Sequence, residues 1–520
     1  MDLRHRPRRA GSSLFALGLM LALCGCSLTG NVTPSPTPTG TASTTTKQFA
    51  SAQCPFSLSL QFVDGQNVRC GYLTVPEDRS DPTSHSIQLA VAVFKTPSHT
   101  PARDPVLFLQ GAPGGRIVQD LAQLIVGGQL DLQGQFGNHD LILVDQRGTG
   151  YSKPSLQCPE VVNLQFTTDV DLTPQQQADA QNQALTTCHA HLVAQGIKLS
   201  AYTTASDAAD IHDLIDALGY PQVDIYGVSY GTRLALEVMR AHPQRVRSVI
   251  LDSTVPAQLN TLTDVPAATA RVFGTLFHGC AVDPRCNAAY PDLENVFYGL
   301  VTSLNAKPMV FQTTDANTGL HYTVRFHGYD LVSLTFSAFY ATPAIALLPQ
   351  MFYQLKNGDT QRAAQLYGIL IFDDAVSWGM YFSVECAEAI DQLTPSQVQS
   401  AAQAYPATIR QDQLVGLEGE LVGCAAWSVG AVPASEADPV TSSIPTLVME
   451  SEYDPITPPA NGDLAAKTLP NSSKFLFPGV GHGAMLFENC PTQIALQFWT
   501  APQHKPDGSC IAGMIAPQFT

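Results

Sequence analysis

The sequence predicts a doubly wound α/β fold, in which helices cover both faces of a mostly parallel sheet. Short, continuous apolar runs recur along the chain, and such runs are typical of strands that are buried on both faces. They lie at residues 105–109, 141–144, 223–226, 249–251, 446–449 and 474–477. Helical patterns at residues 208–218 and 230–241 separate some of these runs, and this alternation is the signature of an α/β domain.

Two stretches depart from the parallel pattern. Residues 56–62, 70–75 and 87–94 alternate between apolar and polar side chains, which predicts an antiparallel edge of the sheet. Residues 256–439 read as mostly helical, with candidate helices at 267–277, 293–304 and 361–370. Because the strand pattern returns near Ile444, we expect this stretch to be an insertion that caps the carboxyl edge of the sheet.

Composition excludes one class of partner. The chain has 520 residues, of which 45% are hydrophobic and 14% charged, and its net charge is −17. Nucleic-acid binding needs clustered Lys and Arg, so we expect no nucleic-acid partner.

The N-terminus has the pattern of an export signal. Four arginines (Arg4, Arg6, Arg8 and Arg9) precede an apolar run at residues 14–23. This run is too short to span a membrane and predicts a secretory signal peptide. The following Cys24-Gly25-Cys26 resembles a bacterial lipobox, which implies cleavage before Cys26 and lipidation of its sulfur. An ordinary signal peptide with another cleavage site is the alternative.

We therefore expect a signal peptide at residues 1–25 and a Thr/Pro/Ser tether at residues 26–50. The tether is too polar to pack. A lipid anchor on Cys26 would hold the chain outside the cytoplasm, on the bacterial cell membrane. Without that anchor the chain would be secreted.

Cysteine usage agrees with export. Ten cysteines remain after Cys24 and Cys26, and an exported chain can keep them as disulfides. Pairing each with its nearest neighbour in sequence gives five short loops. No pair has the C-x-x-C spacing and nearby His of a zinc site, so we expect neither a metal nor a cofactor.

The strongest chemical signal is Gly227-Val228-Ser229-Tyr230-Gly231, which matches G-x-S-x-G. The pattern alone is weak, but here it lies between a predicted strand and a predicted helix. A turn that sharp requires small residues on either side and exposes the serine. The sequence therefore predicts Ser229 as a nucleophile at the start of a helix, whose dipole favours negative charge.

A nucleophilic serine needs a base and an acid, in the chain order Ser, Asp, His for this strand–turn–helix context. Asp454 follows the strand at 446–449, and His482 follows the strand at 474–477 among glycines. Both are therefore expected at the carboxyl edge of the sheet. Asp252 is the alternative acid, and Glu452 a lesser one.

Two backbone N–H groups must hold the oxyanion. Tyr230 directly follows the nucleophile and supplies one. The loop after the strand at 105–109 supplies the other, and we expect Ala112, with Gly111 as the alternative. A second loop, at residues 145–150, lacks the lysine and spacing of a phosphate loop. We interpret it as packed beneath the site, with Arg147 paired internally.

Together these motifs resemble those of proline iminopeptidases, and the chain is most similar to their larger secreted relatives, the tripeptidyl aminopeptidase-type hydrolases. The motifs at residues 110–115, 145–150, 227–231, 454–457 and 481–483 occur in the family's order. The resemblance implies an α/β-hydrolase core at residues 51–255 and 440–520, with a cap at 256–439. Iminopeptidases usually have His-Gly-Gly-Pro-Gly where this chain has Gln110-Gly111-Ala112-Pro113-Gly114.

The resemblance also implies an exported serine exopeptidase that hydrolyses short peptides from the free N-terminus. Such an enzyme needs an anion for the substrate ammonium, and we name Glu385 and Glu388 as candidates, although exposed helix glutamates beside a disulfide would look the same. An esterase with the same triad and an inactive, lipid-anchored binding protein are the alternatives. We expect a monomer.

Overall fold

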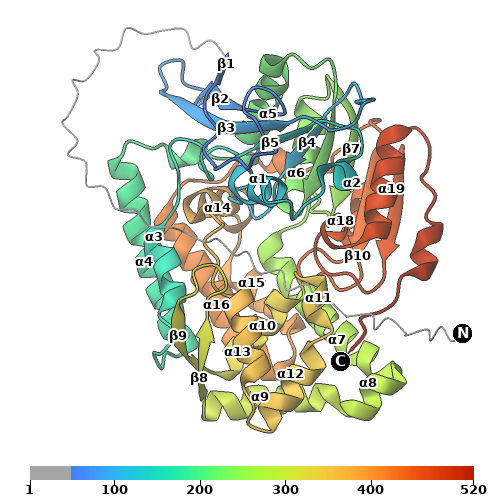
Figure 1. The fold of residues 1–520 in the computed structure, drawn as a ribbon. Coiled ribbons are helices and arrows are strands. Elements are labelled where there is room, and N and C mark those ends of the chain that lie inside the picture. Colours follow the sequence, from blue (N-terminus) through green and yellow to red (C-terminus); the bar gives the residue numbers. More distant parts are fainter. Residues whose placement is uncertain (1–47, 520) are drawn as a thin grey trace, which may run out of the picture.

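The computed structural model describes residues 48–519, in which a nine-stranded sheet forms the centre (Figure 1). Cys26, the predicted signal peptide and the tether up to residue 47 lie outside the described residues. The strand order is β1-β2-β3-β5-β4-β6-β7-β10-β11. The strands are β1 Gln48–Ser51, β2 Val68–Pro76, β3 Ser86–Phe94, β4 Val106–Leu109, β5 Leu141–Val144, β6 Val223–Val228, β7 Val246–Asp252, β10 Thr446–Ser451 and β11 Ser472–Phe477.

Six of these strands are parallel, from β5 through β11, and each of the predicted apolar runs lies in one of them. The antiparallel edge is also confirmed, since β2 pairs with β3 and β3 with β5. The predicted strand at 56–62 is wrong. The edge of β2 pairs instead with β1, while Phe56 packs on Phe94 and Leu60 is fully exposed.

Two hydrophobic clusters cover the two faces of the sheet, because successive side chains of a strand point to opposite faces. Phe108 and Leu143 pack against α1 (Val118–Val126), α2 (Leu132–Phe136) and α19 (Asn489–Thr500). Leu107 and Ile142 belong to the cluster of α5 (Thr204–Leu218) and α6 (Tyr230–Ala241). This arrangement is the predicted doubly wound fold. The N-cap of α5 is Thr203, whose hydroxyl accepts from the Ser206 N–H.

A long insertion joins β7 to its neighbour β10 and lies below the sheet in Figure 1, coloured from yellow-green to orange. Its predicted helices are present within α7, α9 and α13, and it also contains an antiparallel hairpin, β8–β9, that periodicity did not reveal. The elements are α7 Thr261–Val282, α8 Pro284–Ala289, α9 Leu293–Ala306, β8 Met309–Thr314, β9 His321–Phe326, α10 Gly328–Ala338, α11 Thr342–Ile345, α12 Leu348–Lys356, α13 Gln361–Leu370, α14 Trp378–Glu385, the π-helical η3 Cys386–Ile390, α15 Pro395–Ala401, η4 Ala402–Ala404, α16 Ala407–Trp427 and η5 Ala434–Ala437.

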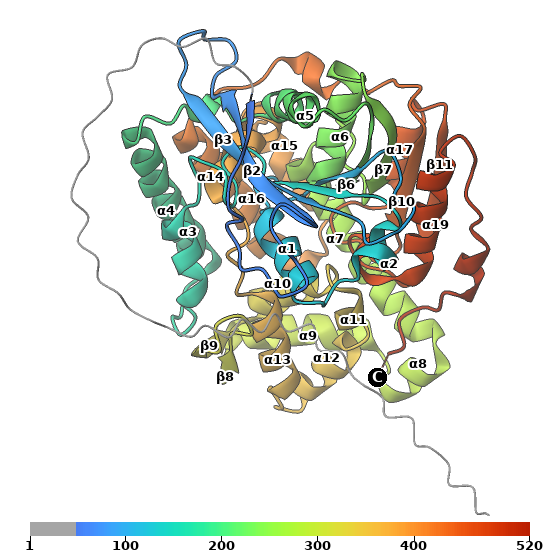
Figure 2. The same cartoon turned by 45° about the horizontal axis from the view of Figure 1, so that its top comes forward.

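Helices outside the insertion complete the fold. The long α4 (Pro174–Ala194) packs along α16, although the two are more than 200 residues apart in sequence, and both lie at the same side of the molecule in Figure 2. The remaining elements are α3 Pro159–Val162, η1 Asn163–Phe166, α4 Pro174–Ala194, η2 Leu199–Ala201, α17 Ala460–Ala466, α18 Ala484–Phe487 and η6 Ser509–Gly513.

The ten cysteines form five disulfides, each between nearest neighbours in sequence as predicted. They are Cys54–Cys70, Cys158–Cys188, Cys280–Cys286, Cys386–Cys424 and Cys490–Cys510. Between residues 48 and 519, no helix combines the length and the apolar character needed to cross a membrane.

Candidate active site

Ser229 lies at the turn from β6 to α6 with φ 57° and ψ −128°, a conformation that L-residues rarely adopt. Its glycine neighbours explain why the motif needs small residues. A Cβ on Gly227 would lie 2.4 Å from the Gly231 carbonyl oxygen, and a Cβ on Gly231 would lie 2.0 Å from that of Leu109. Either side chain would force the turn open, so the two glycines allow the serine to stand at the helix N-terminus.

His482 and Asp454 meet at the same edge of the sheet. His482 Nδ1 lies 2.8 Å from Asp454 Oδ2, and the Asp454 side chain is fully buried. Thr457 donates its hydroxyl to Oδ2 (2.7 Å), while the N–H groups of Ile456 and Thr457 donate to Oδ1 (3.0 and 2.8 Å). Because a carboxylate can only accept, Nδ1 carries the proton and Nε2 is left free to accept another.

The pair also shifts the pKa of each partner. Burial by itself would raise the pKa of Asp454, but the nearby His482 and the Thr457 hydrogen bonds bring it below its ordinary value. Burial would lower the pKa of His482, but attraction to Asp454 outweighs it and raises that pKa. His482 is therefore a stronger base than a free imidazole.

The two alternative acids, Asp252 and Glu452, accept hydrogen bonds from groups other than His482. Asp252 accepts hydrogen bonds from the Ala484 and Met485 N–H groups (2.8 and 2.9 Å) and from the Tyr226 hydroxyl (2.8 Å). It therefore holds the first turn of α18, just after His482. Glu452 accepts from the Gly479 N–H at 2.8 Å.

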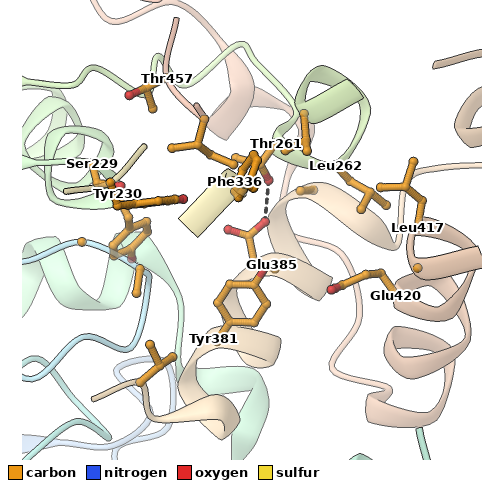
Figure 3. Close-up of a pocket in the computed structure, with 18 of the residues that line it drawn as sticks. Ser229, Tyr230, Thr261, Leu262, Phe336, Tyr381, Glu385, Leu417, Glu420 and Thr457 are labelled. Carbon is orange, nitrogen blue, oxygen red and sulfur yellow. Dashed lines mark hydrogen bonds between the residues drawn. The ribbon is translucent and has the colours of Figure 1, made fainter. Parts of the chain in front are cut away.

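Ser229 and His482 line one cavity of about 870 Å³ between the sheet edge and the insertion (Figure 3). The loop after β4 forms part of the wall, through Gly111 and Ala112. A Cβ on Gly111 would come within 2.7 Å of Ser229 Cβ, so this backbone lies directly against the nucleophile candidate. Ala112 has φ 94°, a conformation that costs an L-residue about 1–3 kcal/mol.

The loop at residues 145–150 supports this wall. Gln146 donates to the Gln110 carbonyl at 2.9 Å, and Asp145 accepts from the first N–H groups of α1. Arg147 is completely buried and forms a two-point ion pair with Asp210, with both distances 2.9 Å. Its predicted internal pairing is confirmed.

Comparisons with known proteins agree with this fold. The family model described as the alpha/beta hydrolase fold matches residues 104–280, which carry β4, the Ser229 turn and β7. A second model, described as a TAP-like protein, matches residues 415–510, which carry Asp454 and His482. The chain therefore has the alpha/beta hydrolase fold.

The curated relatives that the chain resembles are peptidases. The chain is 28% identical to a tripeptidyl aminopeptidase of Streptomyces lividans over 192 residues, which are 36% of this chain and 35% of that enzyme. The chain thus matches only about a third of that relative's length. It is 25% identical to the serine protease Hip1 of Mycobacterium tuberculosis over 438 residues, 79% of this chain and 81% of Hip1. A solved proline iminopeptidase of Mycobacterium smegmatis aligns with 83% of this chain and 98% of its own at 15% identity, with a TM-score of 0.40.

The two glutamates of the hydrolase's insertion differ in their contacts. Glu388 is buried and fully engaged: it accepts from Thr204 and forms an ion pair with Arg233. Glu388 also lines the cavity, so its contact with the substrate ammonium stays a prediction. Glu385 accepts one hydrogen bond, from the Thr261 hydroxyl (2.6 Å), and lines the cavity.

Sequence reasoning missed Glu420, which lies across the cavity from Ser229 and Tyr230 with Glu385 between them (Figure 3). Its Oε2 is one of the buried oxygens in the described chain that have no hydrogen-bond partner. The predicted pairing of the cysteines could have identified Glu420. The predicted Cys386–Cys424 disulfide places α16 beside η3, so Glu420, one turn before Cys424, comes near Glu385.

Proposed function

We propose that this hydrolase is a serine exopeptidase that cleaves short peptides from their free N-terminus, with Ser229, His482 and Asp454 as its triad. The observation that carries the proposal is the buried Asp454–His482 hydrogen bond beside the strained Ser229 turn, on one cavity. The peptidase relatives support the substrate class.

The chemistry follows from this arrangement. His482 Nε2 takes the proton of the Ser229 hydroxyl as Oγ attacks the scissile carbonyl carbon. The N–H groups of Tyr230 and Ala112 hold the resulting oxyanion, and Gly111 is the alternative to Ala112. His482 then protonates the leaving amine. Water, activated by the same imidazole, releases the N-terminal fragment from the acyl-enzyme.

A pair of carboxylates supports recognition of a free amine. Burial raises the pKa of Glu385, and burial together with the nearby Glu385 raises the pKa of Glu420 to about 7. Two such groups so close together repel each other when both are ionised, and a bound ammonium would offset this repulsion. We assign the substrate N-terminus to Glu385 and Glu420, so that the cavity between them and Ser229 holds the residues to be released.

The test compares matched peptides with and without an N-acetyl group, on aminoacyl and tripeptidyl chromogenic substrates. Turnover of the free peptides alone is expected, and the Ser229→Ala variant should lose about 10⁴-fold or more in rate. Equal turnover of blocked and free peptides would favour the esterase alternative. Failure of Ser229 to react with a fluorophosphonate would favour the inactive binding protein.

We also propose that residues 51–255 and 440–520 form the catalytic core, that residues 256–439 act as its cap, and that the mature chain is a lipid-anchored monomer outside the cytoplasm. The five disulfides support an oxidising location. Membrane fractionation tests the anchor: the wild-type chain should sediment with membranes, and the Cys26→Ser variant should not. Sedimentation of both would contradict it.

A further inference from the structure

Glu388 lies in the π-helical turn η3 of the insertion, and three hydrogen bonds occupy both of its carboxylate oxygens. Oε1 accepts from the Thr204 N–H at 2.7 Å, and Oε2 accepts from the Thr204 hydroxyl at 2.8 Å and from Arg233 Nε at 3.1 Å. Its side chain is 3% exposed. π-Helical turns interrupt α-helices rarely and often at functional sites.

The partners of Glu388 lie on both helices that flank the Ser229 turn. Thr204 is the first residue of α5, and Arg233 is one turn after Ser229 in α6. Thr204 Oγ1 also lies 2.9 Å from the hydroxyl of Tyr230, the residue directly after Ser229. The carboxylate takes the single hydroxyl proton of Thr204, so Tyr230 must be the donor in this last bond. At 2.9 Å this contact is shorter than the 3.4 Å between the Tyr230 hydroxyl and Asp207 Oδ2.

The hydrogen bonds thus run in one direction, from Tyr230 to Thr204 to Glu388, while Arg233 approaches the same carboxylate from α6. We propose that Glu388 is a positioning residue: it holds the Tyr230 side chain and the first turn of α6, and thereby fixes the Tyr230 N–H that receives the oxyanion. This inference rests on the proposed roles of Ser229 and Tyr230. It assigns the insertion a part in catalysis that is separate from substrate binding.

The Glu388→Gln variant tests this role. An amide keeps one acceptor, but it turns an NH₂ group toward donors on Thr204 or Arg233, so the bonds can no longer all form. Losing an oxyanion donor outright costs about 10²–10³-fold, so a misaligned donor should lower kcat about 10- to 100-fold. KM for a neutral p-nitrophenyl ester should stay within about threefold, because such an ester has no ammonium for Glu388 to bind and both Glu388 oxygens already accept from Thr204 and Arg233.

A double-mutant cycle distinguishes an effect of Glu388 through Tyr230 from a general loss of structure around the site. Tyr230→Phe removes only the hydroxyl that begins the chain and keeps the N–H. If Glu388 acts through Tyr230, the double variant should fall little below the more damaging single variant. Rates are measured per active site by fluorophosphonate titration, so that a misfolded fraction does not count. Effects of the two substitutions that multiply would overturn the proposal.

Asp224 offers a matched control at the opposite end of β6. Like Glu388, it is buried and accepts from a hydroxyl (Ser248, 2.6 Å) and from an arginine (Arg247, 2.8 Å). Asp224→Asn should lower the melting temperature as Glu388→Gln does, yet leave kcat within about threefold. An equal loss of kcat in both variants would mean that any buried ion pair has this effect, and the proposal would fail.

Using an ester keeps the two hypotheses distinguishable. If wild-type protein cleaves the ester through Ser229 but cleaves no free peptide, the exopeptidase proposal fails. The positioning role of Glu388 is then still tested by the double-mutant cycle, because that cycle is measured on the ester. If Glu388→Gln matches wild type in kcat, the positioning role fails whatever the substrate is.

Discussion

Replacing Asp454 with an asparagine perturbs the site in a direction that the structure dictates. Oδ1 of Asp454 accepts from the Ile456 and Thr457 N–H groups, so the amide oxygen of an asparagine must take that position. Its NH₂ group then faces His482 Nδ1, where a carboxylate oxygen now accepts at 2.8 Å. Two donors cannot face each other, so the imidazole must move its proton to Nε2.

An imidazole protonated on Nε2 cannot accept the proton of Ser229. We therefore expect kcat to fall about 10⁴-fold, which is the scale of a wrong tautomer in a serine triad. The pKa of His482 should fall as well, because attraction to Asp454 is what raises it. The base must be neutral to act, so the acid limb of the kcat/KM profile should move to lower pH.

The assay is ester hydrolysis from pH 5 to 9, with Glu452→Gln as the control on the same loop. The Glu452 carboxylate accepts from the Gly479 N–H, a bond that an amide oxygen can keep, so this variant should leave kcat within about threefold. An Asp454→Asn variant that keeps a tenth of the wild-type rate, or an acid limb that moves to higher pH, would refute this reasoning.

Two further predictions concern the wall of the cavity. Glu420→Gln should raise KM for a free tripeptide about 10-fold or more and leave that of an N-acetylated ester unchanged, whereas Glu418→Gln on the same helix should change neither. Because the pKa of Glu420 is about 7 and only the ionised form attracts an ammonium, wild-type KM for the free peptide should rise as pH falls below about 7. A pH-independent KM would count against the amine site. Ala112→Gly removes the cost of a positive φ, about 1–3 kcal/mol, but glycine loses about 0.5–1 kcal/mol more than alanine in backbone entropy on folding. The free energy of unfolding should therefore rise by up to about 2 kcal/mol, measured by thermal or urea denaturation. A loss of stability would show that this strain is not stored at residue 112.

The features that could be predicted from the sequence are those that local steric constraints determine. The Ser229 turn is specified by glycines two residues away on each side, and the strands that carry Asp454 and His482 are short apolar runs that the sheet requires. Nearest-neighbour pairing of the cysteines was also correct, since short loops cost little to close.

What depended on distant contacts was not predicted. Glu388 looked like a free cavity carboxylate, but its partners Thr204 and Arg233 lie more than 150 residues away in sequence. The strand expected at residues 56–62 lost its pairing edge to β1, a four-residue strand without a clear pattern. The β8–β9 hairpin was missed because its side chains do not follow its burial: Val310 is exposed, whereas Thr313 is buried.

The most direct test of the account is the identity of the nucleophile. Wild-type protein is reacted with a fluorophosphonate, digested and read by mass spectrometry. One label per chain, on Ser229, is predicted, with the rate of labelling falling sharply in the Asp454→Asn variant. A label on another residue, or continued ester hydrolysis by the Ser229→Ala variant, would contradict the account.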